Sequence, residues 1–283
     1  MKPSTRGIGA SLGLAPFLLY VGIFLVVPTV VVFIQAFVVE GSFSLAAIES
    51  LKKPTMVEIT TNTVILSLAT AVLGAVIGAL VAYVVSTANP DGLLRRFVTS
   101  LSGVLAQFGG VTLAFAFIAT VGRTGVVSGW LNGVGLDITN STWLFSLKGL
   151  TLVYTYFQIP LMVIVFLPAL DGIRPQWREA AGTLGASTWQ YWRHVGVPLL
   201  FPAFLGSTLL LFANAFAAYA TAAALINQGS PILALKIGNS LGNEVLGSQA
   251  NIAAAIALEM VVIVAAVMFA YSRLQKRTSG WLR

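Results

Sequence analysis

The sequence contains no cysteine, and its one histidine, His194, stands alone among 283 residues. The absence of cysteine excludes disulfides, thiolate catalysis and cysteine-ligated zinc or iron–sulfur centres, and a single histidine excludes a histidine cluster for metal binding. Charge is scarce as well, because only 9% of the residues are Asp, Glu, Lys or Arg, against about 25% in a typical soluble domain. So few charges cannot cover a water-facing surface, which excludes an ordinary cytosolic enzyme.

Apolar residues are abundant: they make up 57% of the chain, and the mean hydropathy is +0.90. A transmembrane helix needs about 20 mostly apolar residues to cross about 30 Å of hydrocarbon. Six stretches without charge meet this length, at about 12–37, 61–85, 98–121, 149–170, 199–225 and 252–271. The first is too long for the apolar core of a signal peptide, so we expect it to be retained. The sequence predicts an all-α integral membrane protein with a single transmembrane domain over 1–283.

The basic residues predict the orientation of these spans, because cytoplasmic loops carry an excess of Lys and Arg. With the N-terminus inside, 11 of the 16 basic residues fall on the inner side. They are Lys2, Arg6, Arg95, Arg96, Arg174, Arg178, Arg193, Arg273, Lys276, Arg277 and Arg283. We therefore expect both termini in the cytoplasm. The net charge of +7 is explained by this orientation, and short basic runs beside apolar stretches do not indicate nucleic-acid binding.

The inner segment 171–198 is longer and more structured than a connector needs to be. Pro175 suits the first turn of a helix, and Gly185 suits the residue just beyond its end. Ser187 and Gln190 have the spacing of a capping box, which opens a second short helix before Pro198 starts the next span. The pattern predicts a helix, a glycine turn and a helix on the inner face. An alternative is that the segment merely lies along the membrane interface, which its tryptophans favour.

The residues of this segment resemble the EAA loop of ABC-importer permeases. That pattern is E-A-A, three residues, G, nine residues, I, one residue and L-P. It is matched by Glu179, Ala180, Ala181, Gly185, Val195, Val197 and Pro198. Valines replace the isoleucine and leucine, which keeps the apolar character. The six-span layout, with the loop before the fifth span, resembles the same family over most of the chain.

This resemblance implies the fold of a type I ABC importer permease in the inner membrane. In this family the loop docks into a cytoplasmic ATPase dimer and transmits its closure to the membrane helices, and an external protein delivers the solute. A second permease subunit, the same chain or a related one, supplies the other half of the pathway. The chain has no G-x-x-x-x-G-K-[ST] run, so we expect no cofactor in it, no enzyme activity, and ATP and Mg²⁺ bound by the partner ATPase. The ATPase-coupling residues are expected to be Glu179, Ala180, Ala181, Gly185, Val195 and Pro198.

The cargo is less defined by the sequence. The segment after the loop resembles permeases grouped with polyamine, iron(III), thiamine and phosphonate importers, and a polyamine-like solute is our first expectation. Polar residues inside the spans are costly unless they face water or a partner. The candidates for the translocation pathway are Glu259, Asn214, Gln107, Gln158 and Tyr219. A carboxylate at Glu259 could attract a cation or could pair with a neighbour, and the amides are also suited to interhelical hydrogen bonds.

Two other classes of protein remain as alternatives. An ion-coupled secondary transporter would also have six apolar spans, but it would be expected to bury several ionisable groups, and only Glu259 is available. A membrane-embedded enzyme would need a nucleophile, metal ligands or an acid–base pair at membrane depth, which His194 does not provide. Gly74 and Gly78 form a G-x-x-x-G pair, which predicts a close helix contact within the chain or with the second permease.

Overall fold

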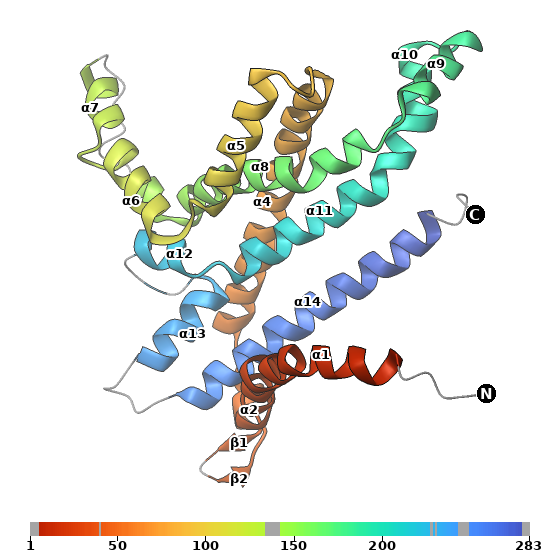
Figure 1. Ribbon diagram of the computed structural model, residues 1–283. Helices are drawn as coiled ribbons and strands as arrows, with labels where there is room; N and C mark the ends of the chain where they lie inside the picture. The colour runs from red at the N-terminus through yellow and green to blue at the C-terminus, as the bar shows by residue number, and fades with distance from the viewer. Residues whose placement is uncertain are drawn as a thin grey trace, which may run out of the picture. The chain divides into compact units, whose positions relative to one another are not determined.

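The computed structural model describes residues 6–39, 41–133, 142–226, 229, 231–242 and 249–278. The chain is almost entirely helical (Figure 1). Six helical segments are long and apolar enough to cross a membrane, at Leu14–Gln35, Pro54–Thr87, Gly110–Gly133, Leu147–Asp171, Thr188–Ala217 and Ala250–Gln275. This confirms the expected all-α fold with six spans. The terminal basic residues Lys2 and Arg283 lie outside the described residues, as do the side chains of Arg6, Lys276 and Arg277.

The elements follow one another with short connections. The first half comprises α1 Arg6–Val21, η1 Gly22–Val26, α2 Val27–Gln35, β1 Val38–Val39, β2 Ser42–Phe43, α3 Ala46–Ser50, α4 Pro54–Thr87, α5 Leu93–Gln107, α6 Gly110–Val121 and α7 Val126–Gly133. The second half comprises η2 Thr142–Phe145, α8 Leu147–Asp171, α9 Pro175–Thr183, α10 Thr188–Tyr191, η3 Trp192–Gly196, α11 Val197–Ala217, α12 Ala220–Leu225, α13 Leu233–Gly242 and α14 Ala250–Thr278. The strands β1 and β2 form a small antiparallel hairpin in which Val38 pairs with Phe43.

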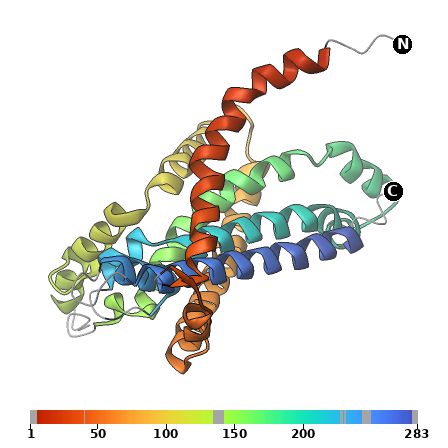
Figure 2. The same ribbon diagram turned by 90° about the horizontal axis from the view of Figure 1, so that it is seen from below.

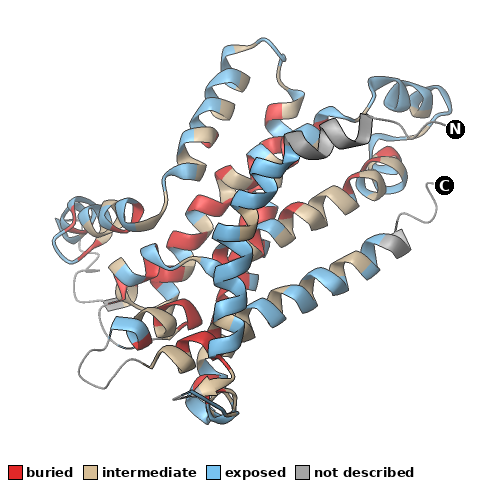
Figure 3. Ribbon diagram, turned by 60° about the horizontal axis from the view of Figure 1, so that its bottom comes forward, coloured by how far each residue is buried: buried red, intermediate tan, exposed pale blue. Residues whose placement is uncertain are grey.

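The chain divides into two compact units, residues 1–57 with 236–263 and residues 58–235 with 264–283. In the first unit, α1 runs through the π-helical turn η1 into α2 as one bent rod (Figure 2). A small core of Ala36, Ala47, Ala254 and Ala255 joins the end of this rod to α3 and the start of α14. No residue of Leu14–Gln35 is buried (Figure 3). This span therefore depends on lipid or another membrane helix to cover it.

The second unit is built around α8, whose inward face is buried along most of its length. Gly74 and Gly78 of α4 lie directly against it: a Cβ at Gly74 would overlap the Cβ of Gln158, and a Cβ at Gly78 would lie 2.7 Å from the carbonyl oxygen of Ile159. The glycine pair therefore makes a close helix contact within the chain, one of the two alternatives that the sequence left open. Small residues permit this approach because a helix backbone can then touch its neighbour.

The helices differ from the expected spans at two interruptions. The stretch 98–121 is divided at Phe108 and Gly109 into α5 and α6, and 199–225 is divided at Ala218 and Tyr219 into α11 and α12. At the first break Gly110 has φ +68°, a left-handed conformation that only glycine adopts freely. A search for stretches without charge measures apolar character and is blind to such interruptions. The second expected span also begins earlier, at Pro54 rather than 61, because proline starts a helix well.

The contact of α4 with α8 leads to a prediction on stability. Gly78→Val should lower the free energy of unfolding by about 1–3 kcal/mol, because the new side chain meets a backbone carbonyl that cannot move aside. The matched control is Gly103→Val in α5, where a Cβ would meet nothing within 4 Å, so both variants carry the same loss of helix propensity. Thermal unfolding in one detergent compares them. Equal melting temperatures would contradict the close contact.

Candidate functional site

The EAA-like loop folds as the sequence predicts in its first part. The helix α9 spans Pro175–Thr183, with proline in its first turn. None of its residues is buried, and the side chains of Glu179 and Ala180 are exposed while Ala181 is half-buried. Leu184, at the end of this helix, is 87% exposed. A helix without any packed face, carrying small residues and an exposed leucine, is a surface available to another protein.

The turn after α9 is fixed by the backbone. Gly185 has φ +78°, the N–H of Ala186 donates to the carbonyl of Ala181 at 2.9 Å, and the N–H of Gly185 donates to that of Gly182 at 2.9 Å. These two bonds define a Schellman motif, in which a left-handed residue ends the helix and satisfies its last carbonyls. Glycine is required at 185 for its conformation, since a Cβ there would meet no atom within 4 Å.

The second helix begins with the expected capping box. The N–H of Gln190 donates to Ser187 Oγ at 3.3 Å, and the N–H of Ser187 donates to Gln190 Oε1 at 2.7 Å. The continuation differs from the expectation that Pro198 starts a separate span. Instead α10, the π-helical turn η3 and α11 form one uninterrupted rod from Thr188 to Ala217. Proline is tolerated because Pro198 stands in the first turn of α11, where its missing N–H is not needed.

Aromatic contacts attach this rod to α4. The rings of Trp192 and Tyr83 pack edge to face with centroids 5.3 Å apart, and Tyr191 is buried. Gly196 is also buried, because a Cβ there would lie 2.5 Å from the Trp192 ring. Val195 is half-buried within the π-helical turn. The loop is therefore rigidly connected to two membrane helices at its second end, while α9 is free of contacts along its outer surface.

An ion pair lies at the same end of this unit. The Arg95 guanidinium, near the start of α5, donates to the carboxylate of Asp171 at the end of α8. At the far end of α14, the Tyr271 hydroxyl donates to the carbonyl of Pro202 at 3.3 Å. The starts of α5 and α11 and the ends of α8 and α14 therefore share one end of the unit with α9.

Three of the expected pathway residues lie at the two helix breaks. Gln107 is the last residue of α5, Asn214 is one turn before the end of α11, and Tyr219 stands between α11 and α12. All three side chains are exposed. Non-helical backbone at membrane depth is tolerated where it is buried in protein or lines a water-filled cavity, and in transporters it often marks a substrate path.

The breaks are braced against each other, a feature that the sequence did not predict. The Thr221 hydroxyl donates to the carbonyl of Gly110 at 3.1 Å, and the Tyr154 hydroxyl donates to the carbonyl of Ala218 at 2.7 Å. Tyr154 and Thr221 are both buried. The paired glycines at 109 and 110 were a local signal for the first break, whereas the partners come from distant segments and could not be read from spacing.

Gln158 and Glu259 have different surroundings from these residues. Gln158 is fully buried in α8, and its Nε2 donates to the carbonyl of Leu211 in α11 at 2.9 Å. This is the interhelical hydrogen bond that the sequence offered as one interpretation. Glu259 is half-buried in α14, within the first unit. In the part of the chain that the structure describes, no three His, Asp or Glu side chains come together as metal ligands.

The sequence is similar to curated permeases. Over 191 residues, 68% of this chain and 62% of the relative, it is 29% identical to the sulfate transport system permease protein CysW of Escherichia coli K12. It is 26% identical over 202 residues to the putative ferric transport permease FbpB 1 of Haemophilus influenzae, covering 71% of this chain and 31% of the relative. The matched parts span less than two thirds of these relatives. No family model matches the sequence.

Solved structures share the fold. A chain of a bacterial ABC transporter that imports the acidic polysaccharide alginate superposes with a TM-score of 0.79, covering 96% of both chains at 19% identity. A chain of the MetNI methionine ABC transporter superposes with a TM-score of 0.61, covering 80% of this chain and 99% of the other at 19% identity. Together these similarities confirm the recognition that the EAA-like loop predicts: the chain has the type I importer fold and is related to ABC-importer permeases.

The buried amide leads to a second prediction. Gln158→Leu should destabilise the protein by about 1–3 kcal/mol, because it removes the bond to Leu211 and leaves that carbonyl without the added donor. Gln107→Leu is the control, since Gln107 is exposed at a helix end. Chemical unfolding in detergent micelles, followed by circular dichroism, measures both. A Gln158→Leu variant as stable as the control would show that the interhelical bond contributes nothing.

Proposed function

We propose that the chain is the membrane-spanning permease subunit of an ATP-driven importer, coupled through α9 to a cytoplasmic ATPase dimer. The observation that carries this proposal is the exposed helix α9, held by a Schellman turn at the end of a continuous membrane rod. Its fold and its relatives support the same role. ATP and Mg²⁺ belong to the partner ATPase, and this chain holds no cofactor and performs no hydrolysis.

The coupling would proceed through rigid bodies. Closure of the ATPase dimer pulls on Glu179, Ala180 and Ala181 of α9, where small side chains permit close approach and the carboxylate can pair with a cation. The fixed turn at Gly185 passes this motion to the rod, which extends through Val195 and Pro198 to Ala217. ATP binding then favours one arrangement of the membrane helices over another by its different affinity for the two.

The translocation pathway is proposed to run along the helix breaks. Exposed Gln107, Asn214 and Tyr219 provide polar side chains there, and an equivalent surface of a second permease, identical or related, would complete the path. Gln158 supports these helices from behind through Leu211. The shared end of the loop, Arg95 and the C-terminal part of α14 supports cytoplasmic placement of the loop and C-terminus in an inner membrane. The N-terminus is proposed to lie on the same side.

The cargo is proposed to be a small solute delivered by an external binding protein. The relatives named above carry sulfate or ferric iron in their names, and thiamine and molybdenum permeases of Escherichia coli are 30% and 31% identical over 39% and 37% of this chain. A polyamine-like cation is favoured only by Glu259. An uncharged polar path accepts either sign of solute, so Glu259 is the residue that distinguishes them.

The turn of the loop gives a direct test of coupling. Gly185→Val should abolish ATP-driven uptake while membrane insertion persists, because a β-branched residue in the left-handed region costs roughly 1–2 kcal/mol or more and redirects α9. The control is Gly182→Ala, inside α9, where a Cβ also meets open space but the backbone is helical. Uptake and ATP hydrolysis are measured in reconstituted vesicles. Full uptake by Gly185→Val would refute the coupling role.

The charge of the cargo can be tested through Glu259. If the solute is cationic, Glu259→Gln should raise the KM for uptake about tenfold, which corresponds to about 1.4 kcal/mol of lost attraction. If the solute is an oxyanion such as sulfate or molybdate, uptake should be unchanged or improved. Uptake of labelled sulfate, molybdate, iron(III), thiamine and spermidine is compared between wild type and variant. Unchanged spermidine uptake would assign Glu259 a structural role.

A further inference from the structure

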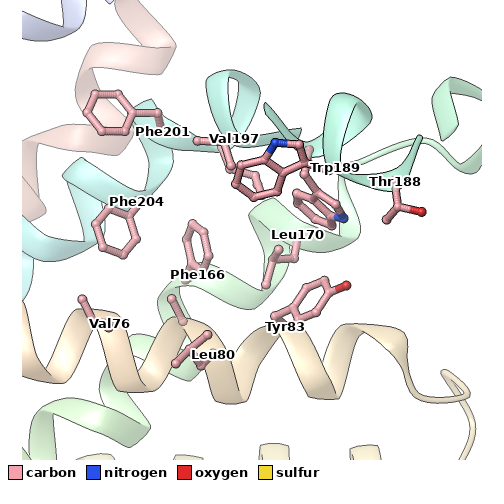
Figure 4. Close-up of a pocket in the computed structure, with 13 residues that line it drawn as sticks. Val76, Leu80, Tyr83, Phe166, Leu170, Thr188, Trp189, Val197, Phe201 and Phe204 are labelled. Carbon is pink, nitrogen blue, oxygen red and sulfur yellow. The ribbon is translucent and has the colours of Figure 1, made fainter. Parts of the chain in front are cut away.

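An apolar groove runs along the second unit between α4, α8 and the rod of α10, η3 and α11. Its volume is about 780 Å³, within the range of about 300–1,000 Å³ that ligand sites fill. Thirteen residues line it, and none of them carries a charge. Val76, Leu80, Phe166, Phe201 and Phe204 form one end (Figure 4). Such a surface offers nothing to a charged solute, so the groove is distinct from the proposed translocation path.

The other end of the groove carries hydrogen-bond donors. The hydroxyls of Tyr83 and Thr188 lie at this end, beside Trp189 and away from Phe201 and Phe204 (Figure 4). Trp192 adds a second indole N–H. Tyrosine and tryptophan with this arrangement, an apolar body and a polar tip, are typical of the depth at which lipid headgroups begin.

Basic groups continue from this donor-bearing end. Arg193 and His194 follow Trp192 on the same π-helical turn, and both are exposed. The Nδ1–H of His194 donates to the carbonyl of Gln190 at 2.9 Å. An arginine guanidinium binds phosphate in a bidentate manner. The sequence from groove to surface is therefore hydrocarbon, then hydroxyl and indole donors, then cation.

We propose that this groove binds an anionic phospholipid, with an acyl chain between α4 and α11 and the headgroup at Tyr83, Thr188 and Arg193. Ester and phosphate oxygens are the acceptors that the donors at this end require. A transmembrane helix of a second copy would match the apolar part alone, because its backbone is self-satisfied and its apolar side chains offer no acceptors. The lipid would thereby contact the root of the EAA-like loop.

The test uses the intact protein in mixed micelles and phosphatidylglycerol with brominated acyl chains, which quench tryptophan fluorescence on contact. We expect saturable quenching that is stronger than with brominated phosphatidylcholine. Most of this quenching should disappear in the double variant Trp189→Phe with Trp192→Phe. It should persist in Trp177→Phe, the matched control in α9. Equal quenching by both lipids, unaffected by the double variant, would overturn the proposal.

Two further variants separate the groove from general lipid contact. Ala79→Phe fills the groove and should weaken phosphatidylglycerol binding about tenfold, the effect of about 1.4 kcal/mol of overpacking. Ile77→Phe, exposed on the same helix but outside the groove, should bind as wild type. Arg193→Gln should reduce the preference for phosphatidylglycerol over phosphatidylcholine, and exposed Arg123→Gln should not. Identical binding by Ala79→Phe and Ile77→Phe would refute the site.

A second copy as the occupant is tested independently, because the chain has no native cysteine. Leu80→Cys in the groove and Val27→Cys in the unburied first span are introduced together. We expect no intermolecular cross-link between them in native membranes. A cross-linked dimer that brominated phosphatidylglycerol does not displace would show that a helix of a second copy fills the groove, and would overturn the lipid proposal.

Discussion

The fold depends on one constraint: within hydrocarbon every main-chain N–H and carbonyl must find a partner in the protein. Long helices satisfy this by themselves, and the two interruptions at Phe108–Gly109 and Ala218–Tyr219 do not. There the neighbours supply donors, since Thr221 reaches the carbonyl of Gly110 and Tyr154 reaches that of Ala218. Each break is therefore held by another segment, and α6, α8 and α12 become one braced assembly. Polar Tyr219 and Gln107 can then remain exposed without loss of order.

Close packing extends this assembly to α4 and α11. Glycine at 74 and 78 brings α4 onto α8, and on another face of α8 Gln158 donates to α11. The central helix is thus tied to one neighbour by shape and to the other by a hydrogen bond. In a membrane, where lipid competes equally for apolar surface, these are the two interactions that can select one helix arrangement. A substitution at either contact acts on the whole second unit.

Local signals in the sequence were sufficient for the coupling loop. Pro175, Gly185 and the pair Ser187 and Gln190 each specify a backbone conformation through their own chemistry, and the structure has a helix start, a left-handed turn and a capping box at those positions. The continuous rod and the braced breaks depend on contacts between distant segments, such as Tyr154 with Ala218, which no spacing encodes. The same holds for the candidate pathway: composition identified Gln107 and Asn214 as unusual, and only the fold placed them at interruptions.

Mechanical continuity decides how the loop can act. Because α10 passes through η3 into α11 without a break, a displacement of Thr188 is a displacement of the whole rod to Ala217. The ring contact of Trp192 with Tyr83 resists sliding of this rod past α4, so motion must either carry α4 along or separate the two rings. Separation opens the apolar groove that lies between them. An occupant of that groove therefore has a different affinity for the two arrangements, and by linkage it shifts the equilibrium on which coupling depends.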